Sequence, residues 1–221
     1  MRLTELANTA VELRYPEDWP PVEYYVRESS IQSQEVEGLR ELVMGNAGER
    51  KLDAYISQHP VLLTALLDFK NTGHHAAWVV PKKAIRSKVS SEIPGLIPDF
   101  IVGGKNSFGI TWYVVELKGA EHSLFTKSGG NLYLSNTANR GLCQVLEYMH
   151  FCNSSQSYLR DTLKLFEFVS AEAFVFVGRE SETDNPREKA LKSAINNISA
   201  NLQIRSYDAL LRSCERILSS Q

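Results

Sequence analysis

The sequence predicts an α/β fold in which a mixed β-sheet is flanked by helices. Four short apolar runs have the length and composition of buried strands, at 77–81, 97–102, 110–117 and 173–177. Apolar residues also recur at helical spacing in 49–67 and 138–152. The predicted core order is therefore helix, three strands, helix, strand.

Composition limits the class of protein. With 221 residues, of which 43% are hydrophobic, the chain can bury the core of one domain. We divide it into an N-terminal arm and helix, residues 1–46, and a body, residues 47–221. The three cysteines lack Cys-x-x-Cys spacing, which argues against a disulfide framework or a structural zinc site. No apolar stretch is long enough to span a membrane, so we expect a cytoplasmic protein without membrane association.

The arm is predicted to start as irregular backbone, because prolines at 16, 20 and 21 favour extended or turn conformations around them. A helix is predicted over Gln34–Met44. The following helix, 49–67, should kink or break near His59-Pro60. The arm also carries three aromatic residues, and these allow an alternative in which it packs against a sister chain as an assembly module: Trp19, Tyr24 and Tyr25.

The two strands 97–102 and 110–117 are predicted to form a hairpin, because Gly103–Asn106 between them has the composition of a turn. Side chains alternate along a strand, so Glu116 and Lys118 should share one face at its end. The hairpin would bring Asp99 beside them. We therefore expect these three groups at one end of the sheet.

A long polar loop is predicted over 119–137, and loops of this length are often binding segments. The helix 138–152 should follow it, with a core stripe of Leu142, Val145, Leu146 and Met149. Gln144 and Tyr148, four residues apart, share an adjacent face of this helix. Tyr148 is expected to pack. The remaining predicted elements are a helix at 156–166, a strand at 173–177, a helix at 187–199, a strand at 202–205 and a final helix.

The grouping of Asp99, Glu116 and Lys118 suggests phosphodiester chemistry. Two carboxylates could bind one Mg²⁺, which takes oxygen ligands and keeps positions for water and substrate phosphate. Mn²⁺ could replace it. The structural alternative is a solvated Glu-x-Lys ion pair at a strand end, which contributes about 0 to 1 kcal/mol.

These residues resemble the motifs of the PD-(D/E)XK nuclease superfamily. Pro98-Asp99 matches the first half of its motif, Glu116-Leu117-Lys118 the second, and Gln144 to Tyr148 resembles its Gln-x-x-x-Tyr element. Over about 47–215 the chain is more closely similar to the nuclease domain of the Shedu anti-phage defence family. The matching segments are 57–63, 97–102, 114–119, the helix that carries Gln144, and 205–211.

The resemblance implies a restriction-endonuclease-like fold, with core order αβββαβ, and a set of site residues. Asp99, Glu116 and the Leu117 carbonyl would bind the metal, Lys118 would act on the attacking water, and Gln144 would contact phosphate or water. Glu49 is a further metal candidate from a helix start, where the helix dipole alone also favours a carboxylate. His59 departs from an expected Asn, which affects no ligand. The resemblance also implies a homo-oligomer.

Charge gives no general indication of nucleic-acid binding, because the formal net charge is −2. A local basic segment, Lys82, Lys83, Arg86 and Lys88, could contact DNA phosphates, with Lys105 and Lys127 as further candidates. The alternative is a solvated loop or edge strand, where lysine discourages aggregation.

The sequence therefore predicts a Mg²⁺-dependent deoxyribonuclease of bacterial anti-phage defence that acts as a DNA endonuclease. The alternative is a catalytically silent member of the same fold that binds nucleic acid or a partner protein.

Overall fold

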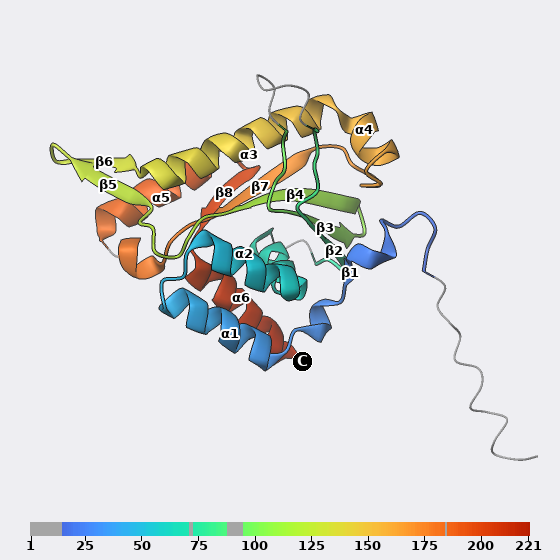
Figure 1. The fold of residues 1–221 in the computed structure, drawn as a ribbon, viewed down its shortest axis with the longest axis horizontal. Helices are drawn as coiled ribbons and strands as arrows, with labels where there is room; N and C mark the ends of the chain where they lie inside the picture. Colours follow the sequence, from blue (N-terminus) through green and yellow to red (C-terminus); the bar gives the residue numbers. More distant parts are fainter. Residues whose placement is uncertain (1–14, 71–72, 88–94, 184) are drawn as a thin grey trace, which may run out of the picture.

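The computed structural model describes residues 15–70, 73–87, 95–183 and 185–221. Six strands form one sheet in the order β1-β2-β3-β4-β7-β8, and a separate two-stranded hairpin is formed by β5 and β6. Helices lie on both faces of the sheet (Figure 1). The predicted α/β class, with a mixed sheet flanked by helices, is confirmed.

The strands run as follows: β1 Tyr25–Val26, β2 Ala76–Pro81, β3 Phe100–Asn106, β4 Gly109–Leu117, β5 Phe125–Ser128, β6 Asn131–Leu134, β7 Ala171–Phe176 and β8 Leu202–Arg205. The α-helices are α1 Ser33–Met44, α2 Glu49–Gln58, α3 Asn136–Ser154, α4 Gln156–Asp161, α5 Pro186–Ile198 and α6 Tyr207–Ser220. Short 3₁₀ helices are η1 Val22–Tyr24, η2 Glu28–Ser30, η3 Pro60–Lys70 and η4 Glu180–Thr183.

The pairs β1–β2, β2–β3 and β3–β4 are antiparallel, whereas the pairs β4–β7 and β7–β8 are parallel. Their register places Leu117, Phe176 and Arg205 in one row across the sheet. The carboxyl ends of β4, β7 and β8 therefore lie along the same edge, where ligands bind in many open α/β sheets.

A separate apolar core fills the space on each face of the sheet. One core joins the sheet to α1, α2, η3 and α6, and the other joins it to α3, α4 and α5. Along β4, Tyr113, Val115 and Leu117 belong to the first core, whereas Trp112 and Val114 belong to the second. The predicted alternation of this strand is confirmed, and it sends Glu116 toward the face that α3 covers.

The predicted break near His59-Pro60 is confirmed, because α2 ends at Gln58 and η3 starts at Pro60. The predicted turn at Gly103–Asn106 is wrong, because these residues belong to β3 and the chain reverses after Asn106. At Gly103 and Gly104, a neighbouring side chain occupies the space that a Cβ would need. A Cβ on Gly103 would lie 2.7 Å from the Trp112 ring, and one on Gly104 would lie 2.8 Å from Leu67.

Two expectations about the segment after β4 are wrong. The polar stretch 119–137 contains the β5–β6 hairpin, which lies beside α3 and α5 in Figure 1. On α3 the predicted Leu146 is 50% exposed. The buried stripe instead consists of Ala138, Gly141, Val145, Tyr148 and Cys152. The prediction chose residues by hydropathy, which favours leucine over glycine or tyrosine for burial. In the structure, small residues and the hydrogen-bonded Tyr148 face the sheet instead.

The predicted helix 156–166 is shorter in the structure, since α4 ends at Asp161. Lys164 and Glu167 have φ angles of 59° and 56°, which a right-handed helix does not allow. The remaining helices and strands predicted after this point are present, and no described helix is long and apolar enough to cross a membrane.

The described part of the arm packs on its own chain. β1 pairs with β2, and the Tyr15 hydroxyl accepts a hydrogen bond of 2.7 Å from Trp78 Nε1. Trp19 packs edge-on against Trp78 with ring centroids 5.3 Å apart, and Tyr25 lies 6.0 Å from the same ring. Helix α1 contributes to the core shared with α2 and α6. The arm thus covers the β2 side of the sheet.

Replacing Gly103 with valine should lower the free energy of unfolding by about 1 to 3 kcal/mol, because the added side chain would overlap the Trp112 ring in a packed core. Urea unfolding followed by circular dichroism measures this change. Ser107→Ala, in the exposed turn that joins β3 and β4, serves as the control and should change little. Equal stability of both variants would contradict the close packing described for Gly103.

Candidate active site

Asp99 lies immediately before β3 and is fixed to the end of β4. Its Oδ2 accepts a hydrogen bond from the Leu117 backbone N–H at 2.8 Å. Its backbone carbonyl accepts another from the Lys82 N–H at 2.9 Å. The antiparallel pairing of β3 with β4 makes this contact possible, as the sequence predicted.

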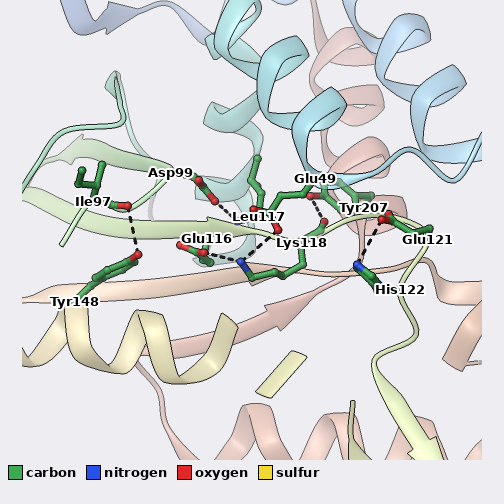
Figure 2. Close-up of polar contacts among 10 residues, drawn as sticks. All are labelled: Glu49, Ile97, Asp99, Glu116, Leu117, Lys118, Glu121, His122, Tyr148 and Tyr207. Atoms are coloured by element: carbon green, nitrogen blue, oxygen red, sulfur yellow. Dashed lines mark hydrogen bonds and ion pairs between the residues drawn. The ribbon is translucent and has the colours of Figure 1, made fainter. Parts of the chain in front are cut away.

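Glu116 and Lys118 lie side by side on the α3 face of β4. Their side chains are buried, with residue exposures of 3% and 7%, and Lys118 Nζ donates to Glu116 Oε1 at 2.7 Å. The same ammonium lies 3.4 Å from Glu49 Oε2 at the start of α2. Figure 2 shows Lys118 Nζ between these two carboxylates, with Asp99 nearby, just before the adjoining strand β3. The structure thus brings Asp99, Glu116, Lys118 and Glu49 together.

Two further residues position Lys118, and the sequence analysis gave neither a role. The buried Tyr207 hydroxyl at the start of α6 donates to the Lys118 carbonyl at 2.7 Å (Figure 2). Gly141 on α3 leaves space for the lysine stem, since a Cβ there would lie 3.2 Å from Lys118 Cε. Tyr207 belongs to the segment 205–211 that resembled the Shedu family, so this match was the available indication.

Helix α3 places Gln144 and Tyr148 next to the carboxylates. Tyr148 is buried, as predicted, and its hydroxyl donates to the Ile97 carbonyl at 3.3 Å. Burial raises the pKa of Tyr148, the nearby Glu116 and Asp99 charges raise it further, and a hydrogen bond with Gln144 partly opposes them. The Tyr148 hydroxyl therefore connects Gln144 to the acidic cluster.

The acidic residues are held in an environment that favours their protonated forms. Burial raises the pKa of Glu116 to about 7, the Asp99 charge adds to this effect, and hydrogen bonding to Lys118 opposes it. Burial also raises the pKa of Asp99, although the Leu117 N–H and Lys118 act against it. For Lys118, burial lowers the pKa, but the surrounding carboxylates outweigh it and the net pKa is raised. Lys118 is therefore protonated at neutral pH.

Asp53, which the sequence analysis missed, adds a fourth acidic residue near this site. It lies one helical turn after Glu49 on α2, and its charge raises the pKa of Asp99. Asp53 Oδ2 binds Lys82 Nζ at 2.7 Å. Its Oδ1 is buried and has no hydrogen-bond partner among the described residues. Only the fold reveals it, because no sequence motif includes this position.

Most of the basic candidates are already paired with carboxylates. Arg86 Nη2 lies 3.6 Å from Glu147, and Lys83 is half-buried. Lys88 lies outside the described residues. Two lysines farther along the chain are also paired: Lys105 with Glu167 at 2.9 Å and Lys127 with Glu188 at 3.2 Å. Lys82 is bound to Asp53. To bind phosphate, the four paired cations would therefore have to leave their carboxylate partners: Lys82, Arg86, Lys105 and Lys127.

The chemistry of the ligand atoms fits a hard divalent cation. Asp99 and Glu116 offer carboxylate oxygens, and burial together with neighbouring carboxylates raises the pKa of both. Within the described ranges, however, no three His, Cys, Asp or Glu side chains are grouped closely enough to hold a metal. Two protein carboxylates, with water and substrate in the other positions, match the way Mg²⁺ is usually bound.

A family model for the C-terminal part of the Shedu protein SduA matches residues 46–211. The chain belongs to this Shedu family. The match covers well over half of the 221 residues and includes every residue of the cluster around Lys118. No curated protein matches the chain. Membership of the Shedu family suggests a role in anti-phage defence and is consistent with a nuclease.

Stability should depend on the protonation of Glu116. Its pKa is about 7 in the folded protein against an ordinary value of 4.5, so the folded state binds the extra proton between these values. The free energy of unfolding should therefore fall by roughly 1 to 3 kcal/mol as pH rises from about 4.5 to 7. Denaturant unfolding in a chelating buffer measures it.

The Glu116→Gln variant provides the control for this measurement. It removes the titrating group and keeps a hydrogen-bond acceptor for Lys118, so its stability should fall less over the same pH range. A variant with the same pH slope as the natural protein would show that Glu116 titrates normally.

Proposed function

We propose that this Shedu family member is a metal-dependent DNA endonuclease that hydrolyses phosphodiester bonds in bacterial anti-phage defence. The observation that carries the proposal is the meeting of Asp99, Glu116 and Lys118 at the end of β4. All three are held by specific contacts: Asp99 by the Leu117 N–H, and Glu116 and Lys118 by each other. A PD-(D/E)XK nuclease would use these same three residues.

The arrangement of the elements also supports the proposal. Helix α2 precedes the antiparallel strands β2, β3 and β4, and α3 connects them to the parallel strand β7. We interpret this order as the αβββαβ core of a restriction-endonuclease-like fold. Such a core places the acidic residues where two neighbouring strands meet.

The proposed mechanism assigns a task to each side chain. Asp99, Glu116 and the Leu117 carbonyl would bind Mg²⁺, or Mn²⁺ in its place, with Glu49 in support. The cation supplies Lewis-acid polarisation of the phosphoryl group. Lys118 orients the attacking water and stabilises negative charge, because its raised pKa disfavours a role as general base.

Helix α3 contributes a further polar group to the proposed reaction. Gln144 would hydrogen-bond a phosphate oxygen or the attacking water, and Tyr148 packs and orients it. We assign substrate backbone contacts to the basic segment Lys82, Lys83, Arg86 and Lys88. DNA as substrate, assembly as a homo-oligomer and a cytoplasmic location complete the proposal.

The alternative is a catalytically silent member of the fold. One observation favours it: the Glu116 and Glu49 carboxylates already have a cationic partner in Lys118. Such a protein would bind DNA or a partner without cutting. The comparison of cleavage and binding separates the two functions.

In the presence of Mg²⁺ or Mn²⁺ the protein should cleave plasmid or linear DNA, and a chelator should stop the reaction. Lys118→Ala should lower the rate at least about 100-fold, since it removes charge stabilisation at the reacting phosphate. DNA binding, measured by fluorescence anisotropy, should be retained. The fold should survive as well, because Glu116 can take up a proton when its partner is lost.

Two further variants make this test specific. Lys118→Met keeps the length of the stem and should be as inactive as the alanine variant. Lys164→Ala removes an exposed lysine far from the cluster in sequence and should cleave normally. Full activity of both Lys118 variants would disprove the assignment, and tight binding without cleavage under any metal condition would support the silent alternative.

Gly141 provides a test that leaves every proposed metal ligand in place. Gly141→Val should slow cleavage at least about tenfold, because a Cβ there already approaches Lys118 Cε and Val175 and a larger side chain must displace the lysine. Cys143→Val, an exposed position on the same helix, is the control and should retain activity. Normal cleavage by Gly141→Val would show that the position of the lysine stem does not matter.

A further inference from the structure

A second polar pocket lies away from the acidic cluster, beyond edge strand β8. It has a volume of about 700 Å³ and is formed by η4, α5 and the end of β8. Ligand pockets of this size commonly hold small molecules. Neither the proposed reaction nor the Shedu family match assigns any function to it.

The described lining of this pocket is rich in positive charge. Lys189, Lys192 and Arg205 contribute cations, and Glu180 is the acidic residue among the described lining. Glu180 is already neutralised, since its two carboxylate oxygens accept hydrogen bonds of 2.7 and 2.5 Å from Arg212. Lys189 has an interaction of its own, so the positive charge available to a ligand comes from Lys192 and Arg205.

Lys192 is the key cation. It is half-buried on α5, and within the described ranges it forms no ion pair. Burial lowers the pKa of Lys192, and the Arg205 and Arg212 charges act in the same direction, whereas the Glu180 and Asp208 carboxylates oppose them. A partly desolvated ammonium beside a second cation gains most from an anionic ligand.

The other described lining residues offer hydrogen bonds but no ring. Ser181, Ser193 and Asn197 present hydroxyl and amide groups at the pocket. Asn196 is already used, because its side chain bonds the backbone of Ile204 in β8 through both amide atoms. None of the described lining residues is aromatic, so a nucleobase would find no stacking surface here. The pocket suits the phosphate part of a ligand.

We propose that the pocket between η4, α5 and β8 is a binding site for phosphate groups, with Lys192 as the main charged contact and Ser193 and Asn197 as neutral donors. Arg205 adds a second positive charge, although its guanidinium also donates to Gln203 Oε1 and lies 4.7 Å from the centre of the Phe69 ring. The phosphates could belong to a small phosphorylated molecule or to a nucleic-acid backbone. Arg205 ends β8 in the same row as Leu117, two strands away, so the site lies on the same sheet edge as the acidic cluster. It does not depend on that cluster being catalytic.

The test uses the full chain and sodium pyrophosphate as the probe, in chelating buffer so that no metal can carry the anion to Glu116. Calorimetric titration should show one site per chain. Lys192→Met should weaken binding at least about tenfold, and so should Asn197→Asp, which adds a negative charge at an exposed part of the lining. Arg216→Gln removes one exposed charge from α6 outside the pocket and should bind like the natural protein.

Thermal unfolding separates a ligand contact from a structural role. Lys192→Met should keep or raise the melting temperature without ligand, because it removes a partly desolvated charge, whereas a lysine needed for the fold would lower it. Glu116→Gln should bind pyrophosphate normally, which separates this site from the proposed nuclease site. Absence of pyrophosphate binding by the natural protein, or equal affinity in Lys192→Met, would overturn the proposal.

DNA binding identifies the source of the phosphate. If Lys192→Met also lowers the affinity for a fluorescent DNA duplex in anisotropy titrations, the site holds a nucleic-acid backbone. If pyrophosphate binding falls while DNA affinity stays unchanged, the ligand is a small phosphorylated molecule. Both results support the site, and neither requires that the protein cleave DNA.

Discussion

The buried ion pair between Glu116 and Lys118 is the interaction on which the rest of the site depends. Two opposite charges are removed from water at the end of a central strand, where each is costly without the other. The sheet fixes their backbone, and Asp99 is tied to the same strand end through Leu117. The apolar cores on both faces thus hold a charged group that an isolated strand could not keep in place.

Strand periodicity was sufficient to predict the centre of the site. The alternation along β4 placed Glu116 and Lys118 on one face, and a hairpin brought Asp99 next to them even though its turn was predicted too early. Local sequence missed the turn because Gly103 and Gly104 serve packing: Trp112 and Leu67 occupy the space that side chains would need. Glycine alone does not distinguish a turn from a tightly packed strand.

Residues that reach the site from distant elements could not be predicted in the same way. Tyr207, Gly141 and Asp53 approach the cluster from α6, α3 and α2, so their roles depend on tertiary packing rather than on spacing. The Shedu family match identifies residues 46–211 as one family region, but it gives no side-chain contacts. The sequence was therefore sufficient to predict the grouping of Asp99, Glu116 and Lys118. The fold was needed to find the residues from other elements that surround them.

The hydrogen bond from Tyr207 to the Lys118 carbonyl connects the C-terminal helix to the centre of the sheet. Its hydroxyl is fully enclosed, and the same helix packs against α1, whose Arg40 contacts Glu215. Any event that detaches this last helix would also free the backbone beside the buried ion pair. The geometry of the acidic cluster therefore depends on the docking of α6, an element that lies about ninety residues farther along the chain than the lysine whose backbone it holds.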